Sequence, residues 1–155
     1  ASLDQWLSAF LAGRKSRTDL AGLDLRAALR SLLDRPQQEY LERAAPTHFT
    51  APTGSRLRLD YTAPDGPVLC VRLQEMLGVA ETPKIADGKV SVLVELLSPA
   101  GRPVQTTRDL AGFWRGSYAQ VRAEMKGRYP RHYWPDDPLA ARPTKRTKKA
   151  MDRDR

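Results

Sequence analysis

The chain has 155 residues, a formal net charge of +8 and a pI near 10.0. Its mean hydropathy of −0.54 argues against a membrane protein, and so does the absence of any apolar run near the roughly 20 residues that a spanning helix needs. With 41% hydrophobic residues it can bury a core, and its length suits one domain or one domain with a helical appendage. The missing initial Met favours a fragment of a longer chain.

The positive charge is concentrated at the C-terminal end. Residues 126–155 hold ten Lys and Arg against four Asp, whereas residues 1–125 hold sixteen against fourteen acids. A basic end of this kind attracts polyanions through Coulomb forces and counterion release. A solvated tail that only aids solubility is a common alternative. RNA or another polyanion is therefore the first class of partner to consider.

Residues 1–46 are predicted to form short helices. Apolar residues recur at three- and four-residue spacing in residues 3–11 and again in residues 25–33. Pro36 suits the first position of a third short helix, and Pro46 ends the helical region. We expect these apolar faces to be buried against each other, against the next region or against a domain that is missing here.

Residues 47–130 are predicted to form a small antiparallel β domain, which makes the fold class α+β. Strict alternation in residues 56–61 indicates a half-buried strand, and the turn at residues 63–67 leads into a return strand. Residues 90–97 are apolar at nearly every position, which is typical of a central strand covered on both faces.

Two further segments bear on the architecture of the sheet. A short helix is favoured for residues 72–78, although a strand could continue there, and residues 98–102 form a hairpin loop before the last strand. If residues 47–50 are the first strand, this order matches a small OB-like Greek-key barrel. An open antiparallel sheet fits the same order.

The clearest predicted element is a long amphipathic helix over residues 108–127, capped by Thr107 or Asp109. Its apolar arc, which includes Trp114, is expected to close the β domain. A second arc beside it consists of Arg108, Arg115, Arg122 and Lys126. This basic arc is a candidate RNA-contacting surface, and a solvated helix face is the alternative.

Residues 131–155 are predicted to form a Pro-rich, extended and basic tail. Aromatic and basic residues alternate near its start, a pattern that suits stacking on unpaired bases and neutralising phosphates. The candidate nucleic-acid-binding residues in this part are Arg128, Arg131, Tyr133, Trp134, Lys145, Arg146, Lys148 and Lys149. The aromatic residues could equally anchor the segment to the domain as a strap.

No motif for catalysis is present. The chain lacks a G-x-x-x-x-G-K-[ST] phosphate loop, and Thr53-Gly54-Ser55, which resembles its end, is interpreted as a turn before a strand. Cys70, His48 and His132 lack the spacing of metal ligands, and Cys70 is predicted to be a small buried hydrophobe. We therefore expect no catalytic residue, no metal site and no cofactor in this chain.

Several blocks together resemble the C-terminal region of HrpB-type helicases. The blocks are PTGSR (52–56), VRLQEM (71–76), LVELLSP (93–99), RPVQTTRDL (102–110), FW (113–114), EMKGRYP (124–130), WPDDP (134–138) and PTKRTKK (143–149). The similarity extends over about residues 20–149, and it is specific in combination, since no single block would suffice.

This resemblance implies a parent DEAH-box RNA helicase, cytoplasmic, that hydrolyses ATP in two upstream RecA-like domains. ATP and Mg would be needed only in that absent helicase core. The chain would be the non-catalytic C-terminal accessory domain, with the core domains of the same parent chain as partners. In related helicases an OB-like accessory domain lies near the RNA channel, which supports contacting or guiding RNA. The alternative is a protein-docking module that packs on the core or recruits a protein partner.

Overall fold

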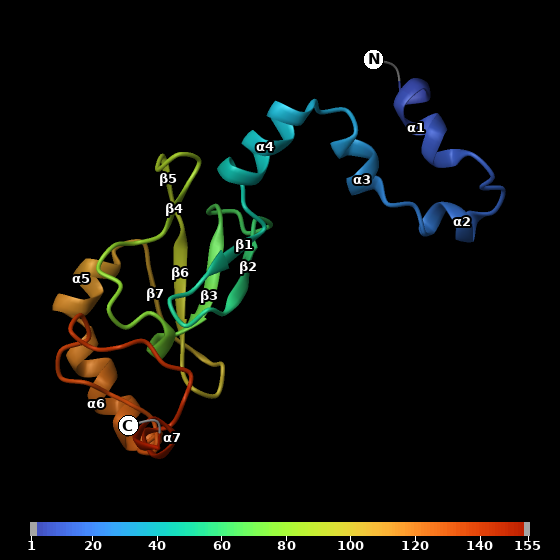
Figure 1. Ribbon diagram of the computed structural model, residues 1–155. Helices are drawn as coiled ribbons and strands as arrows, with labels where there is room; N and C mark the ends of the chain where they lie inside the picture. Colours follow the sequence, from blue (N-terminus) through green and yellow to red (C-terminus); the bar gives the residue numbers. More distant parts are fainter. Residues whose placement is uncertain (1–2, 154–155) are drawn as a thin grey trace. The chain divides into compact units, whose positions relative to one another are not determined.

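The computed structural model describes residues 3–153. The chain divides into two compact units, a helical unit that ends at Ala44 and a sheet unit that begins at Ala45. Figure 1 shows the helices and strands of each unit.

The helical unit contains four short helices. They are α1 (Leu3–Leu11), α2 (Arg17–Ala21), α3 (Leu25–Arg30) and α4 (Arg35–Ala44). The extra helix, α2, begins with a capping box that the hydrophobic pattern did not indicate. The Asp19 N–H donates to the Ser16 hydroxyl at 3.1 Å, and the Ser16 N–H donates to the Asp19 carboxylate at 3.0 Å.

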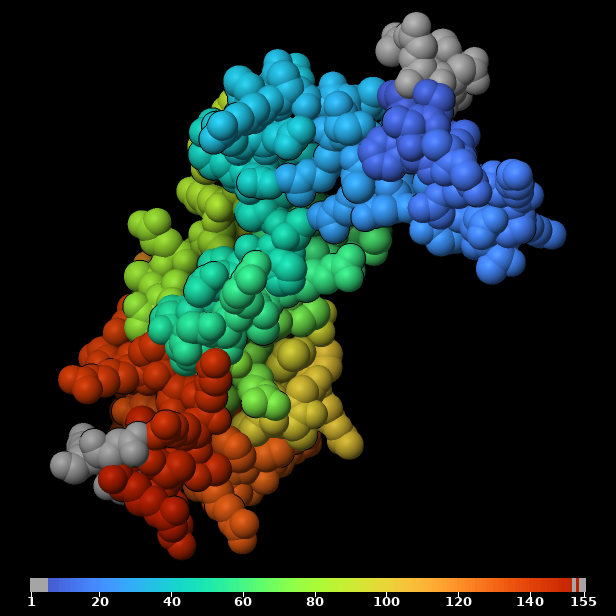
Figure 2. Space-filling view, turned by 45° about the vertical axis from the view of Figure 1, so that its right-hand side comes forward, coloured from blue at the N-terminus to red at the C-terminus, as the bar shows by residue number. Residues whose placement is uncertain are grey.

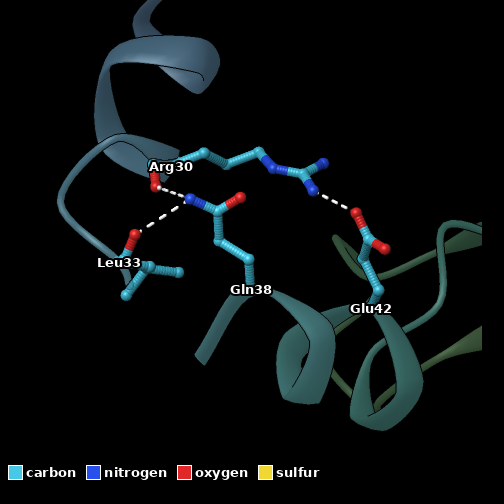
Figure 3. Close-up of polar contacts among 4 residues, drawn as sticks. All are labelled: Arg30, Leu33, Gln38 and Glu42. Atoms are coloured by element: carbon cyan, nitrogen blue, oxygen red, sulfur yellow. Dashed lines mark hydrogen bonds and ion pairs between the residues drawn. The ribbon is translucent and has the colours of Figure 1, made fainter. Parts of the chain in front are cut away.

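Polar contacts join α3 to α4, and Figure 3 shows them. The Gln38 side-chain amide donates to the carbonyl oxygens of Arg30, the last residue of α3, at 3.0 Å and of Leu33, in the turn that follows, at 2.9 Å. The Arg30 guanidinium forms an ion pair with Glu42 across the same junction. These contacts fix the turn between the two helices.

The sheet unit is built on five strands. They are β1 (His48–Thr50), β2 (Arg56–Asp60), β3 (Val68–Arg72), β6 (Leu93–Leu97) and β7 (Pro103–Thr107), in the order β1-β2-β3-β6-β7. The hairpins predicted between β2 and β3 and between β6 and β7 are confirmed, because both pairs are antiparallel. The fold class is therefore α+β, as predicted.

The sheet is mixed, so the expectation of a purely antiparallel sheet is wrong at one pairing. β3 and β6 run parallel, with Val68 opposite Leu93 and Arg72 opposite Leu97. A parallel pair needs a crossover, which here contains the 3₁₀ turn η1 (Leu73–Glu75) and the small hairpin of β4 (Lys84–Ile85) and β5 (Val90–Ser91). In the described residues β1 and β7 are the two edges of an open sheet, so the barrel alternative is also wrong.

The predicted long helix over residues 108–127 is divided in two. α5 (Leu110–Arg115) is capped by Asp109, whose carboxylate accepts from the Gly112 N–H at 2.8 Å. Gly116 ends it, and α6 (Tyr118–Arg128) follows after Ser117. Glycine is a poor helix former, and the residues on the two sides of the break, Trp114 in α5 and Tyr118 in α6, are buried in the same core.

The core of the sheet unit is continuous. It contains fifteen buried residues from the central strands, η1, α5, α6 and the segment after α6. Trp114 is 5% exposed and its indole N–H donates to the Val79 carbonyl at 2.7 Å, so its predicted place in the core is confirmed. Phe113 and Tyr118 pack against its ring in tilted and edge-on geometry.

Candidate nucleic-acid interface

Residues 131–147, which we call the C-terminal strap, lie against the sheet unit. Figure 2 shows this red segment side by side with the orange helical region. Trp134 is 4% exposed, and its indole N–H donates to the Tyr129 carbonyl at 3.0 Å. The Tyr118 hydroxyl donates to the Pro135 carbonyl at 2.8 Å, and burial raises the pKa of Tyr118 to about 12. The ring of Trp134 is therefore part of the core, which agrees with the alternative that the aromatic residues anchor this segment as a strap and not with stacking on bases.

The two ends of the strap are joined to each other. His132 and Thr147 form an antiparallel bridge, and the Lys148 N–H donates to the Arg131 carbonyl at 2.9 Å. Tyr133 is half-buried against the core, whereas the Arg131 side chain is exposed. The strap thus turns back on itself, and it brings the start and the end of the predicted tail together.

The predicted basic arc is not a continuous surface. Arg108 lies before α5, and its guanidinium donates to the Asp65 carbonyl in the turn between β2 and β3. Its own carbonyl accepts from the Thr82 hydroxyl at 2.9 Å. Arg115 is exposed at the end of α5, but the break at Gly116 separates it from the residues of α6. Arg108 therefore clamps a turn, and Arg115 stands apart.

The basic residues of α6 differ in their surroundings. The Arg122 side chain is 24% exposed, pairs with Asp136 and donates through Nε to a strap carbonyl at 3.2 Å. Arg128 pairs with Glu124 at 3.1 Å, and Lys126 is exposed. Arg122 therefore holds the strap, whereas Lys126 and Arg128 remain on the surface.

The remaining candidates gather at the end of the chain. We call Arg131, Lys145, Arg146, Lys148 and Lys149 the basic cluster. All five are exposed, and the last two lie in the short helix α7 (Lys148–Asp152). The bridge between the strap ends holds these side chains in one region. This arrangement was not apparent from the sequence, which indicated only an extended tail.

Beside the basic cluster is a small pocket that sequence reasoning did not find. It is lined by Arg72, Gln74, Pro99, His132, Thr144, Lys145 and Arg146. The register that places Arg72 opposite Leu97 brings η1 next to the loop after β6, and the strap covers both. The Thr144 N–H donates to the Gln74 carbonyl at 2.9 Å, which fixes the strap there.

Thr53-Gly54-Ser55, the segment that superficially resembles a phosphate loop, is a turn. Gly54 has a φ of 80°, which favours glycine, and its N–H donates to the Ala51 carbonyl at 2.8 Å. The hydroxyls of Thr53 and Ser55 both donate to Glu75, which is 5% exposed. The two hydroxyls are therefore engaged with a buried carboxylate, and the predicted interpretation as a turn is confirmed.

Cys70 is exposed, so the prediction that it is buried is wrong. Side chains alternate along β3, and because Leu69 and Val71 point into the core, Cys70 points outward. Partial burial by its neighbours, together with the carboxylates of Glu95 and Asp60, raises the pKa of the thiol. The thiol is therefore protonated at neutral pH and poorly suited to act as a nucleophile.

In the described part of the chain, no group of three or more His, Cys, Asp or Glu side chains is placed to hold a metal ion. None of the described helices is long and apolar enough to cross a membrane.

Comparison with known proteins identifies relatives along nearly the whole chain. Residues 6–138 match the HrpB C-terminal family model, described as ATP-dependent helicase C-terminal. The chain is 52% identical over 149 residues to the ATP-dependent RNA helicase HrpB of Escherichia coli (strain K12), which covers 96% of this chain and 18% of that protein.

Two solved structures show the same fold. The crystal structure of the E. coli DExH-box NTPase HrpB matches 94% of this chain and 18% of its own, with a TM-score of 0.87 and 51% identity. The crystal structure of the Escherichia coli DEAH/RHA helicase HrpB matches 85% of this chain and 17% of its own, with a TM-score of 0.69 and 48% identity. The chain thus spans 18% of the length of the curated relative that it matches. It belongs to the HrpB family of ATP-dependent helicase C-terminal domains.

Proposed function

We propose that this chain is the non-catalytic C-terminal accessory domain of a cytoplasmic, ATP-dependent RNA helicase, and that it contacts RNA through its basic cluster. The named relative is an RNA helicase, and this chain matches only 18% of it. ATP hydrolysis, with its Mg, then belongs to the remainder of such a protein, and the partners of this domain are RNA and the helicase core.

The observation that carries the RNA contact is the convergence of the basic cluster. Five exposed cations gather where the strap turns back on itself. Exposed Lys and Arg side chains neutralise phosphates and release counterions, which favours RNA of any sequence. Lys126 and Arg128 on α6 are further contacts in this proposal. Arg108 and Arg122 donate to backbone carbonyls and Trp134 is in the core, so these three are left out of it.

A titration with single-stranded RNA at several salt concentrations tests this proposal. We expect log K to fall linearly with log salt for the full chain. Replacing Lys145, Lys148 and Lys149 by Gln should reduce the slope by about 2, because each phosphate contact on a single strand contributes roughly 0.7. The Lys84→Gln and Lys89→Gln double variant, on the β4–β5 hairpin, is the control and should leave the slope unchanged.

Deleting residues 126–155 would be a poor test of the same proposal, because the deletion would also remove Trp134 from the core. Undetectable RNA binding by the full chain at low salt would contradict the proposal.

Protein docking is the second candidate function, and the helical unit favours it. Among its residues 6–44 only Ala28 is buried, while large apolar side chains are exposed. They are Leu20, Leu25, Leu29, Leu32, Tyr40 and Leu41. A surface of this kind is typical of a contact site for another part of a longer protein or for a partner.

A further inference from the structure

The pocket beside the basic cluster contains two polar atoms with no hydrogen-bond partner. Among the described residues, the buried side-chain atoms left unpaired are Nε2 of Gln74 and Nδ1 of His132. Gln74 is only 4% exposed, so bulk water does not compensate its amide. Buried polar atoms without a partner are rare in native proteins, and here two of them belong to residues that line the same pocket.

A third polar group in the pocket can also donate. The Thr144 hydroxyl accepts from the Arg146 N–H at 3.0 Å, which leaves its own proton for a second partner. Thr144 is 7% exposed, and its backbone N–H is already engaged by Gln74. The interior of the pocket therefore offers donors from Gln74, Thr144 and, in its Nδ1–H form, His132.

The charge of the pocket defines the ligand further. Its lining includes the three cations Arg72, Lys145 and Arg146 and no carboxylate. All three are exposed at the rim, whereas Gln74 and Thr144 are buried inside. Cations around a set of buried donors are the arrangement that binds phosphate oxygens, because charge-assisted hydrogen bonds are the strong ones.

We propose that this pocket binds a single phosphate group. Gln74, Thr144 and His132 donate to its oxygens from the inside, and the cations of the rim balance its charge. The space is small, so the pocket accepts a phosphate oxygen or two and not a nucleobase. The group comes either from an RNA backbone, a form that rests on the function proposed above, or from free phosphate, which does not require it.

Titration of the full chain with inorganic phosphate at constant ionic strength tests the proposal. We expect saturable shifts of the Gln74 side-chain amide and the His132 ring resonances in NMR spectra. Gln74→Glu replaces the amide donors with a carboxylate and should weaken phosphate binding at least tenfold. Lys145→Gln, at the exposed rim, leaves the fold intact and should weaken it severalfold.

The control is Lys89→Gln, which removes one positive charge from an exposed turn outside the pocket and should leave phosphate binding unchanged. The proposal is overturned if phosphate causes no saturable shift. It is also overturned if the Gln74 and Lys145 variants bind phosphate as tightly as the Lys89 variant does.

A short single-stranded RNA then distinguishes the two sources. If RNA shifts the same resonances and competes with phosphate, the backbone of RNA supplies the group. If phosphate saturates the pocket while RNA leaves it unaffected, free phosphate is the ligand. If RNA does not bind at all but phosphate does, the RNA-contacting function fails and the phosphate site stands.

Discussion

The two units of this chain achieve stability in different ways. The sheet unit buries fifteen residues in one continuous core drawn from strands, helices and the strap. The helical unit has one buried residue, Ala28, among residues 6–44, and it is held by caps and by the polar contacts of Gln38 and Arg30. Burial of apolar surface is the dominant favourable term in folding. Only the sheet unit therefore has the hydrophobic core that an independent domain needs.

The difference bears on function. A unit with a complete core can present charges on a fixed surface, as the basic cluster and the pocket require. A unit that exposes its leucines gains stability only when something covers them, which fits a docking role. In the function proposed above, RNA contact belongs to the sheet unit and protein contact to the helical unit, and the following experiments test that division.

The largest expected effect is on the strap. Trp134→Ala should lower the free energy of unfolding by about 3–5 kcal/mol, as large-to-small changes of buried aromatic residues do. Urea denaturation of the full chain measures this loss. Leu139→Ala, in the same segment, is the control, and because Leu139 is 42% exposed the loss should stay below about 1 kcal/mol. Equal effects of the two changes would mean that the strap is not part of the core.

A smaller effect is expected from removing the helical unit. Residues 45–155 alone should keep the stability of the sheet unit within about 1 kcal/mol, because its core contains no residue of the helical unit. Residues 1–44 alone should show little helix in far-UV circular dichroism, since isolated helices shorter than roughly 12 residues are marginal in water. If the isolated peptide were stably helical, the claim that the helical unit lacks stability of its own would be contradicted.

The local elements of the sheet unit were predictable because their signals are local. The alternation around Leu57 and Leu59 predicted a strand, and the Pro- and Gly-rich turns predicted the two hairpins. The parallel pairing of β3 with β6 was not predictable, since it depends on contacts between segments that no turn connects. The break at Gly116 was missed because the apolar spacing continues across it, from Trp114 to Tyr118.

The candidate site was predictable only as a list of cations. Charge counting found Lys145 and Lys148, but it could not separate them from Arg122, which forms an ion pair with Asp136 and donates to a backbone carbonyl of the strap. The pocket escaped notice because Gln74 and His132 carry no pattern of their own. The block VRLQEM, which supported the family resemblance, was the available signal, since it contains two of the residues that line the pocket.

The smallest expected effect is the change in stability with acidic pH, because the groups with shifted pKa values differ between the two units. Both histidines lie in the sheet unit. Burial and the nearby Arg72 lower the pKa of His132, and Lys145 and Arg146 line the same pocket. In the helical unit, hydrogen bonds from Ser16 lower the pKa of Asp19.

Both effects lower stability as the pH falls, but they do so in different pH ranges. Below about pH 6.5 the unfolded chain protonates His132 more readily than the folded chain, so the sheet unit should lose a little stability there. The stabilising contribution of Asp19 is present above about pH 4 and is lost only as the pH falls further. Thermal unfolding between pH 7 and 5 should therefore show a loss of stability in the wild type. The His132→Gln variant should not show this loss. The His48→Gln variant, which changes an exposed histidine, is the control and should still show it. Added phosphate should counteract this loss, because a bound anion favours the protonated ring. If the His132 variant loses as much stability as the wild type over that range, the ring does not control this titration.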